Sequence, residues 1–193
     1  PRTKYEDVIV PLHGQHQGDN ASLAICAVEE FFGDTINREI LDEGMSSVKM
    51  PGRFEVLGHR PLAIIDGAHN PAGAEVCARV FFEDFNTQGR KILVTGALRS
   101  RNPEDLLLSF RANEFDVVIT CMPPTPRGLP AEEMAKVAQS IGCGDVRVTD
   151  SVEKACQAAI NLAQDDDAIL VTGSLYIVSA ARPYLLSHLA KHI

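Results

Sequence analysis

The sequence has no apolar run that approaches the roughly 18 residues of a membrane-spanning helix. Its first residues, PRTKYEDVIVPL, lack the apolar stretch and the small-residue cleavage site of a signal peptide. The five cysteines are widely separated and never form a CxxC pair, so neither a disulfide framework nor a zinc site is indicated. These absences predict a cytoplasmic protein with reduced thiols and no membrane partner.

The sequence contains fewer positively charged than negatively charged residues. Lys and Arg number 18 against 26 for Asp and Glu, which gives a formal net charge of -8. Nonspecific nucleic-acid binding depends on massed Lys and Arg, so we do not expect nucleic acid as a partner. An acidic protein can still bind an anion through a few placed arginines and oriented backbone N–H groups, which makes single arginines worth following.

Both common phosphate-binding fingerprints are missing. The sequence contains no GxxxxGK[ST], and the loop after the first expected parallel strand reads GAHNPAG rather than GxGxxG. A self-sufficient P-loop or dinucleotide site is therefore disfavoured. The chain also has no initial Met and enters an expected strand at Val8 to Leu12 close to its first residue, so we expect a chain entered midway.

The composition, 45% hydrophobic and 23% charged, is typical of a soluble globular protein. We place a domain boundary in the aperiodic segment 45–51, with residues 1–47 and 48–193 on its two sides. A length of 193 residues allows one domain with such an appendage and a substantial core.

In the first part we expect a helix over 20–32, with Asp19 or Asn20 as its N-cap, and a short helix over 37–42. In the second part, 54–57 and 62–65 read as a hairpin.

The rest of the chain alternates strand and helix. This alternation predicts an α/β fold with a Rossmann-like, mostly parallel sheet and helices on both faces, because parallel strands need crossovers that cover them. The expected strands are 62–65, 92–95, 117–120, 146–148 and 168–171, and the expected helices are 71–82, 103–110, 130–140, 152–163 and one from residue 175.

In an open α/β sheet, ligands bind beyond the carboxyl ends of the strands, which makes the residues after each strand candidates for a site. Three such loops stand out: DGAHNP from Asp66, TGALR from Thr95 and TGSLY from Thr172. Asp66 could accept hydrogen bonds from a ribose beside the N-terminus of the next helix. The competing interpretation is that Asn70 simply caps that helix, and caps occur at most helices.

Arg53 lies in PGRFE just beyond the expected linker, where its guanidinium could pair with a phosphate across an interdomain cleft. A solvated arginine, or an ion pair with Glu55, is an equally open alternative. From the other side of that cleft, His16, Gln17 and Asn20 could line the same ligand, although a lone loop histidine is more often a surface residue.

Taken together, the segments HGQHQGDNASLAICAVE, PGRFEVLG, IIDGAHNPAG and VTGSLYIVSAAR resemble the folylpolyglutamate synthase and dihydrofolate synthase family of the Mur ligase superfamily. The similarity runs in colinear order from Pro11 to Arg182. It implies that residues 1–47 are the end of a central ATP-binding domain and that 48–193 are the Rossmann-like C-terminal domain.

The resemblance also implies the chemistry and the roles of site residues. Members use ATP and Mg²⁺ to convert a folate carboxylate into an acyl phosphate, which the amine of L-glutamate then attacks. By this similarity Asn20 contacts the adenine end of ATP, Arg53 its phosphates and Asp66 the nucleotide. His69 is a second residue at that cleft, and Ser174 lies on the glutamate side. Arg53 and His69 are the expected catalytic residues, and we expect a monomer.

Two features depart from the family pattern. The P-loop and the Mg²⁺ ligands are missing from this sequence, so we expect the fragment alone to be inactive. Many members also carry an acidic DKD-like segment after the second strand, where this chain has Leu98-Arg99-Ser100-Arg101-Asn102. These arginines could meet an anionic substrate, although solvated arginines are the default.

Two other functions stay open: a stand-alone nucleotide-binding or regulatory module, and a Mur-type ligase acting on a cell-wall precursor. The sequence does not distinguish a dihydrofolate synthase from a folylpolyglutamate synthase or a bifunctional enzyme.

Overall fold

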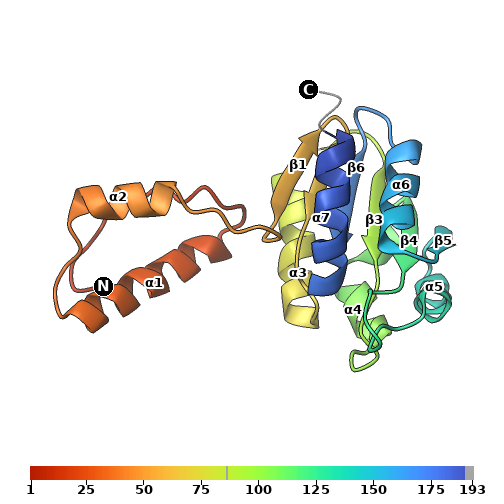
Figure 1. Ribbon diagram of the computed structural model, residues 1–193, viewed down its shortest axis with the longest axis horizontal. Coiled ribbons are helices and arrows are strands. Elements are labelled where there is room, and N and C mark those ends of the chain that lie inside the picture. Colours follow the sequence, from red (N-terminus) through yellow and green to blue (C-terminus); the bar gives the residue numbers. More distant parts are fainter. Residues whose placement is uncertain (86, 190–193) are drawn as a thin grey trace. The chain divides into compact units, whose positions relative to one another are not determined.

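The computed structural model describes residues 1–85 and 87–189, and the chain divides into two compact units, Pro1–Pro51 and Gly52–Ile193 (Figure 1). The boundary between residues 47 and 48 that we placed from the sequence stays a prediction about the parent enzyme's domains. Each unit is described by itself below.

The first unit contains two helices, α1 (His16–Phe32) and α2 (Arg38–Ser46). Ile25 of α1 and Leu41 of α2 are among its buried apolar side chains. The Asn37 side chain caps α2 by accepting from two backbone N–H groups, as is usual for an Asn at this position. Leu23, Phe31, Phe32 and Ile40, by contrast, are largely exposed.

Three expectations for this unit are wrong. α1 begins at His16, with Gln15 at the capping position and no side-chain cap, so Asp19 and Asn20 lie inside the helix. The polar run HGQHQ concealed this start because it carries no apolar periodicity, yet Gln is a good helix former. The helix α2 continues past residue 42 to Ser46, through Gly44.

The segment from Val8 to Leu12 is also not a strand. Its apolar residues satisfied the composition of a strand, but a strand exists only as part of a ladder, and the described residues offer this segment no partner.

The second unit is built on a six-stranded sheet with the order β1-β2-β6-β3-β4-β5. Strand β1 pairs with β2 in antiparallel fashion, as the expected hairpin requires, and every other pair is parallel. The α/β fold class predicted from the sequence is therefore confirmed. The strands are β1 (Glu55–His59), β2 (Leu62–Ile65), β3 (Lys91–Thr95), β4 (Val117–Cys121), β5 (Asp145–Thr149) and β6 (Ala168–Thr172).

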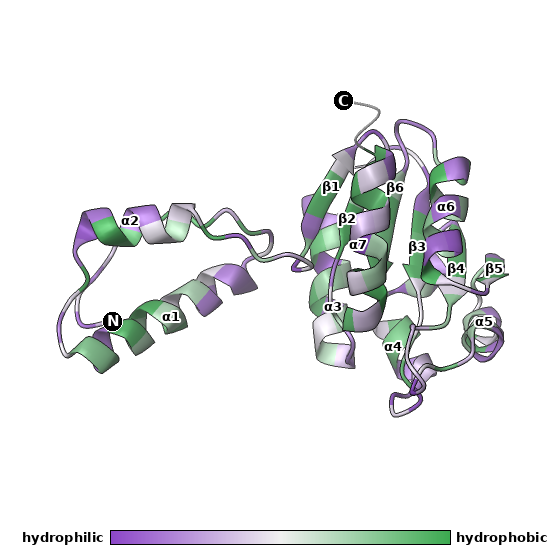
Figure 2. Ribbon diagram, viewed as in Figure 1, coloured by the Kyte–Doolittle hydropathy of each residue, from purple (hydrophilic) through white to green (hydrophobic). Residues whose placement is uncertain are grey.

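Helices cover both faces of this sheet, so the core has two layers. The strands alternate between them: Ile64 and Leu93 face one layer, and Ile65 and Val94 face the other. One layer packs against α3 (Pro71–Arg79), α4 (Pro103–Ser109) and α5 (Ala131–Ser140), and the other packs against α6 (Val152–Leu162) and α7 (Leu175–Leu189). Figure 2 shows the strands between these helices coloured mostly as hydrophobic residues.

The strands and helices of this unit lie within a few residues of their predicted positions. One difference is the helix expected over 71–82, which is α-helical only to Arg79 and continues as a single π-helical turn, Val80–Asp84. The parallel strands all point the same way, so the loops after β2, β6, β3, β4 and β5 meet at one edge of the sheet, which we call the carboxyl edge.

Candidate functional site

Two segments that the sequence singled out are joined at the carboxyl edge by hydrogen bonds. The N–H of Gly67, in the loop after β2, donates to the carbonyl oxygen of Gly52 at 2.8 Å. The Asp66 carboxylate accepts from the N–H of Phe54 at 2.9 Å and, through its other oxygen, from the N–H of Ala68 at 2.9 Å. The Asp66 side chain therefore holds the turn before β1 against the loop after β2.

Arg53 lies in the turn that Asp66 holds. Its neighbour Phe54 has a φ of +43°, a left-handed conformation that is unusual for a bulky residue, and is only 2% exposed. Arg53 itself is exposed, and its side chain makes no hydrogen bond or ion pair within the part of the chain that the structure describes. The guanidinium is thus free to meet a ligand.

Glu55 is not the partner of Arg53, so the ion pair considered from the sequence is wrong. The Glu55 carboxylate accepts from Nε and Nη2 of the Arg182 guanidinium, most closely at 2.7 Å, and from the N–H of Gly52 at 2.8 Å. The guanidinium of Arg182 lowers the pKa of Glu55. This pair fixes the other end of the turn to α7.

His69 and Asn70 complete the loop after β2. The Nδ1 atom of His69 lies 2.8 Å from the carbonyl oxygen of Gly67, and because a carbonyl oxygen only accepts, Nδ1 carries a proton. Nε2 of the neutral ring is then an acceptor. Asn70 accepts from the N–H of Gly73 at 2.8 Å, which confirms the helix-cap interpretation.

Ser174 lies at the start of α7, next to this loop. Its side chain is buried, and its Oγ accepts from the N–H of Tyr176 at 3.2 Å. The preceding Gly173 donates its N–H to the carbonyl oxygen of Ala68 at 3.1 Å, so the loops after β2 and β6 touch. Gly173 has a φ of +103°, and a Cβ there would lie 2.4 Å from the carbonyl oxygen of Gly96. Only glycine, which has no Cβ, fits this position without a clash.

One arginine of this edge was missed from the sequence, and it contacts Tyr176 of the TGSLY loop. Arg127, in the loop after β4, donates to the Tyr176 hydroxyl at 2.5 Å, and its Cζ lies 5.7 Å from the Tyr176 ring centroid. Arg127 lies in the loop CMPPTPRG after β4. The rule that ligands bind beyond the carboxyl ends of strands applies to this loop as it does to the other three, and it is the signal that points to Arg127.

The second unit thus brings together Arg53, Asp66, His69 and Ser174, four of the five predicted site residues. Asn20 lies in the first unit, on α1, where its side chain is exposed and donates to the Gln17 amide oxygen at 3.1 Å. That Asn20 contributes to the same site as the other four residues stays a prediction.

Nucleophilic catalysis by cysteine finds no support at this edge. Burial, followed by the neighbouring Asp66 carboxylate, raises the pKa of the Cys77 thiol well above its ordinary range. The thiol therefore stays protonated and poorly nucleophilic.

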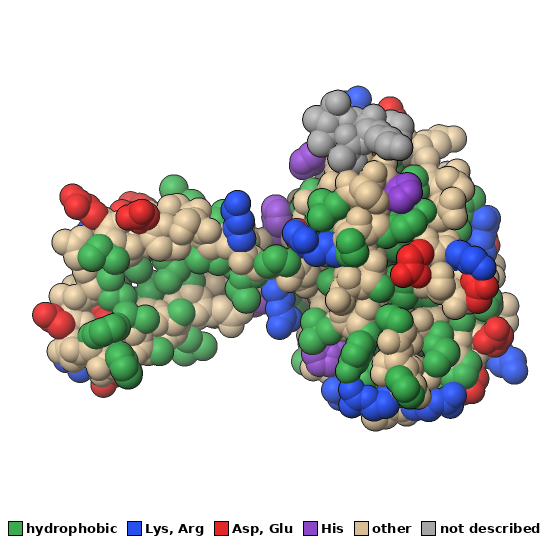
Figure 3. Space-filling view, viewed as in Figure 1, with side chains coloured by type: hydrophobic (Ala, Val, Ile, Leu, Met, Phe, Trp, Pro, Cys, Tyr) green, Lys and Arg blue, Asp and Glu red, His purple; other side chains and the backbone are tan. Residues whose placement is uncertain are grey.

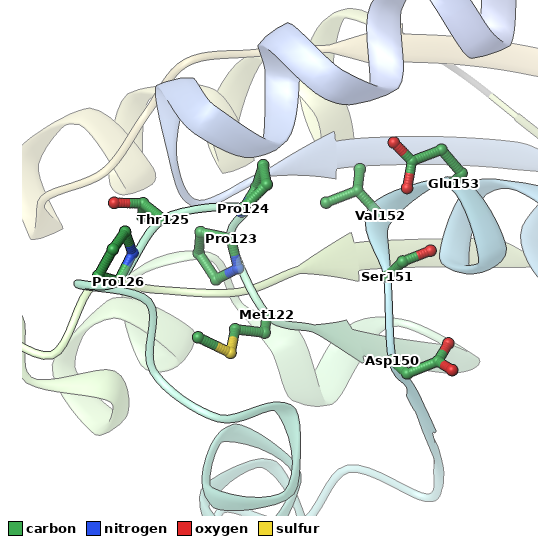
Figure 4. A pocket seen from close by; sticks show the side chains of 9 residues that line it. All are labelled: Met122, Pro123, Pro124, Thr125, Pro126, Asp150, Ser151, Val152 and Glu153. Carbon is green, nitrogen blue, oxygen red and sulfur yellow. The ribbon is translucent and has the colours of Figure 1, made fainter.

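A hollow of about 390 Å³ lies at the same edge, where the loops after β4 and β5 diverge toward opposite faces of the sheet (Figure 4). It contains none of the predicted site residues. Two of its polar side chains already have structural partners: Ser151 caps α6, and Asp150 pairs with Lys154 at 2.6 Å. Its lining residues are Met122, Pro123, Pro124, Thr125, Pro126, Asp150, Ser151, Val152 and Glu153.

The described residues also limit what the chain can bind by itself. Within residues 1–85 and 87–189, no group of three or more His, Cys, Asp or Glu side chains is placed to hold a metal ion. The residues present therefore do not fit Mg²⁺. Across the same residues, no helix combines the length and the apolar character needed to cross a membrane.

The fold and its strand-end loops define a Rossmann-like α/β domain. The family model described as "Mur ligase, glutamate ligase domain" matches residues 52–175, which is more than half of the chain. The chain belongs to the Mur ligase family, in its folylpolyglutamate synthase and dihydrofolate synthase branch, and corresponds to the C-terminal portion of these enzymes.

Relatives with assigned names support this placement. The chain is 35% identical to a probable bifunctional folylpolyglutamate synthase/dihydropteroate synthase of Halobacterium salinarum, over 90% of the chain and 20% of the relative. It is 32% identical to a dihydrofolate synthase/folylpolyglutamate synthase of Mycobacterium tuberculosis, over 92% of the chain and 40% of the relative. The chain thus spans well under half the length of these relatives.

A solved structure agrees with the sequence comparison. Folylpolyglutamate synthase of Mycobacterium tuberculosis, complexed with ADP and AMPPCP, superimposes with a TM-score of 0.86 at 32% identity, over 94% of this chain and 42% of that one. That protein binds adenine nucleotides, and its C-terminal domain shares the fold of the second unit.

Proposed function

We propose that this chain is the C-terminal part of an ATP-dependent ligase that adds L-glutamate to a folate or to dihydropteroate. The observation that carries the proposal is the pair of hydrogen bonds that the Asp66 carboxylate accepts, which hold Arg53 on the same edge as His69 and Ser174. We call a polypeptide in which this chain follows a P-loop domain the longer protein.

The proposed reaction has two steps. A carboxylate oxygen of the acceptor attacks the γ-phosphorus of ATP and ADP leaves, which gives an acyl phosphate. The amine of glutamate then attacks the acyl carbon, phosphate leaves, and the amine gives up a proton as the amide forms. Negative charge develops on phosphoryl and carbonyl oxygens in both steps, and positive groups fixed in advance stabilise it.

Each site residue has a role in this proposal. Arg53 contacts the phosphates with a guanidinium that no other described side chain occupies. Asp66 holds the turn that carries Arg53 and offers its remaining lone pairs to the nucleotide, His69 faces the same nucleotide, and Ser174 lies on the glutamate side. Asn20 contacts the adenine end of ATP.

We further propose that residues 1–47 are the end of the central ATP-binding domain. The apolar side chains that the first unit leaves exposed support this assignment: Phe31 of α1 is 83% exposed and Leu23 is 68% exposed. Large apolar side chains exposed to this degree on one element are typical of an interface. In the longer protein these side chains pack against the rest of that domain.

The 193-residue chain alone is expected to release no ADP. Its sequence contains no P-loop, and its described residues hold no cluster that fits Mg²⁺. We expect the metal ligands in the remainder of the longer protein, and we assign no step of the reaction to a metal held by this chain.

Two measurements test the proposed function. The reading frame upstream of Pro1 should encode a GxxxxGK[ST] segment, whereas a native start near Pro1 would favour a stand-alone nucleotide-binding module. The longer protein should then incorporate labelled L-glutamate into dihydropteroate or tetrahydrofolate. Incorporation into a cell-wall precursor instead, or into none of the three acceptors, would overturn the folate assignment.

A further inference from the structure

The loops that follow β3 and β4 lie side by side at the carboxyl edge. Leu98 and Gly128 form an isolated antiparallel bridge. The N–H of Arg99 donates to the carbonyl oxygen of Arg127 at 2.9 Å, and the N–H of Leu129 donates to that of Ala97 at 2.8 Å. These backbone bonds hold the two loops as one surface.

These two loops carry three arginines in a chain whose net charge is -8. Residues 96–103 and 122–131 contain Arg99, Arg101 and Arg127, and the first turns of the helices that follow carry the exposed acidic residues Glu104, Asp105, Glu132 and Glu133. Figure 3 shows Lys and Arg side chains along the lower rim of the second unit, with Asp and Glu side chains nearby on the same face.

The side chains of Arg99 and Arg101 have few partners among the described residues. All three arginines are exposed, and Arg99 approaches the carboxylate of Glu133 only at 4.0 Å. The side chain of Arg101 makes no hydrogen bond or ion pair with any residue in the described ranges. Exposed pairs of this kind contribute little to stability, so an anionic ligand can displace the Glu133 contact.

Arg127 connects this surface to the residue proposed for glutamate. Its guanidinium donates to the hydroxyl of Tyr176, and the N–H of Tyr176 donates to Oγ of Ser174. The arginines therefore continue outward from Ser174 along the carboxyl edge.

We propose that Arg99, Arg101 and Arg127 bind the poly-γ-glutamyl chain of an extended folate through its carboxylates. The proposal rests on the proposed function, because it names a further part of that ligase's substrate. Each γ-linked glutamate keeps its α-carboxylate free, so the chain carries a row of carboxylates, and guanidinium groups match a carboxylate with two parallel hydrogen bonds.

The number of arginines favours this ligand over a nucleic acid. Three guanidinium groups in an acidic protein are too few to follow a phosphate backbone, but several carboxylates on one flexible chain can engage them together. A single glutamate can engage fewer of them, so longer chains bind more tightly.

Calorimetric titration of the 193-residue chain with tri-γ-glutamate and with single glutamate tests the proposal. Tri-γ-glutamate should bind about tenfold more tightly than glutamate, because its additional carboxylates can contact further exposed arginines. Arg99→Gln and Arg101→Gln should each weaken tri-γ-glutamate binding about threefold, and the double variant about tenfold. Arg101→Lys, which keeps the charge but loses the paired N–H groups of the guanidinium, should weaken binding less than Arg101→Gln does.

Arg60→Gln is the matched control. Arg60 is exposed and lies in the turn before β2, at the opposite edge of the sheet, and its substitution removes the same charge. It should leave binding within about twofold, as expected for screened charges far from the ligand. Equal affinity for tri-γ-glutamate and glutamate, or equal weakening by Arg60→Gln and Arg101→Gln, would refute the proposal.

Ligation by the longer protein separates this inference from the proposed function. Arg101→Gln should raise the KM for a triglutamyl folate about threefold and leave kcat, and the KM for a monoglutamyl folate, unchanged. If the unmodified longer protein ligates no glutamate at all, the proposed function fails. If it ligates glutamate but Arg101→Gln changes the KM for the two folates by the same factor, only the assignment of the arginines fails.

Discussion

The Asp66 carboxylate accepts a hydrogen bond from the N–H of Phe54 at 2.9 Å and so joins the end of β2 to the turn that carries Arg53. The bond therefore connects the loop after β2 to the segment before β1, and β1 and β2 are the two strands of the hairpin. A residue expected to touch a nucleotide thus also has a structural role, because it holds Phe54 in its left-handed conformation.

Asp66→Asn should therefore destabilise the 193-residue chain even without a ligand. The amide keeps one oxygen acceptor and loses the other, so one of the two N–H groups, of Phe54 or of Ala68, loses its partner. We expect a loss of about 1–2 kcal/mol in the free energy of unfolding, measured by urea denaturation. Asp165→Asn, at an exposed position without a side-chain hydrogen bond among the described residues, should change it little. Equal stabilities of the two variants would show that Asp66 has no structural role.

Gly173→Ala should be costly because the position combines a positive φ with a close backbone neighbour. A Cβ would lie 2.4 Å from the carbonyl oxygen of Gly96. We expect a loss of at least about 2 kcal/mol in the same assay. Gly144→Ala is the control, since a Cβ there meets nothing within 4 Å, and it should change stability by less than about 0.5 kcal/mol. Similar losses at both positions would contradict the close approach of β3 and β6.

Asp167 should give the protein a pH-dependent stability. Burial tends to raise the pKa of this carboxyl, but hydrogen bonds from the N–H groups of Gln164 and Arg90 and from the Arg90 guanidinium outweigh it, and the pKa is lowered. A lowered folded-state pKa contributes stability above the unfolded value of about 4, and this contribution is lost as pH falls through the folded value.

Asp167→Asn should consequently cost about 2 kcal/mol near neutral pH. The difference from the unmodified chain should shrink as pH falls below about 4. Urea denaturation at a series of pH values measures this difference. A constant difference across the series would mean that the charge of Asp167 contributes nothing.

Much of the second unit could be predicted from its sequence. The buried strands β3, β4 and β6 are short apolar runs bounded by turn residues, and their alternation with helices allows few other folds. The strand-end rule then placed Asp66 and Ser174 at one edge. The first unit was harder, because the start of α1 is polar and the residues from Val8 to Leu12 are apolar without forming a strand.

The contacts that hold the site together could not be predicted. Glu55 pairs with Arg182 across 127 residues, and Asp66 reaches the backbone of Phe54 across a chain reversal. Such contacts depend on the register of the hairpin and on how α7 packs, neither of which a local pattern contains. The sequence left an ion pair between Arg53 and Glu55 open as one alternative, and in the structure Glu55 pairs with Arg182 instead.

Arg53→Gln tests the proposed role of the free guanidinium in the longer protein. Removing one fixed positive group that stabilises developing charge should lower kcat about 100-fold, measured as ADP release with saturating folate and glutamate. The stability of the 193-residue chain should stay the same, because Arg53 makes no side-chain contact among the described residues. A rate equal to that of Arg60→Gln would exclude Arg53 from the reaction.

Steady-state ADP release, compared between the 193-residue chain and the longer protein, tests the central claim most directly. The account predicts no folate-dependent release from the chain, and release that requires both a folate substrate and L-glutamate from the longer protein. Folate-dependent ADP release by the chain alone, or a longer protein whose ADP release needs neither substrate, would contradict it.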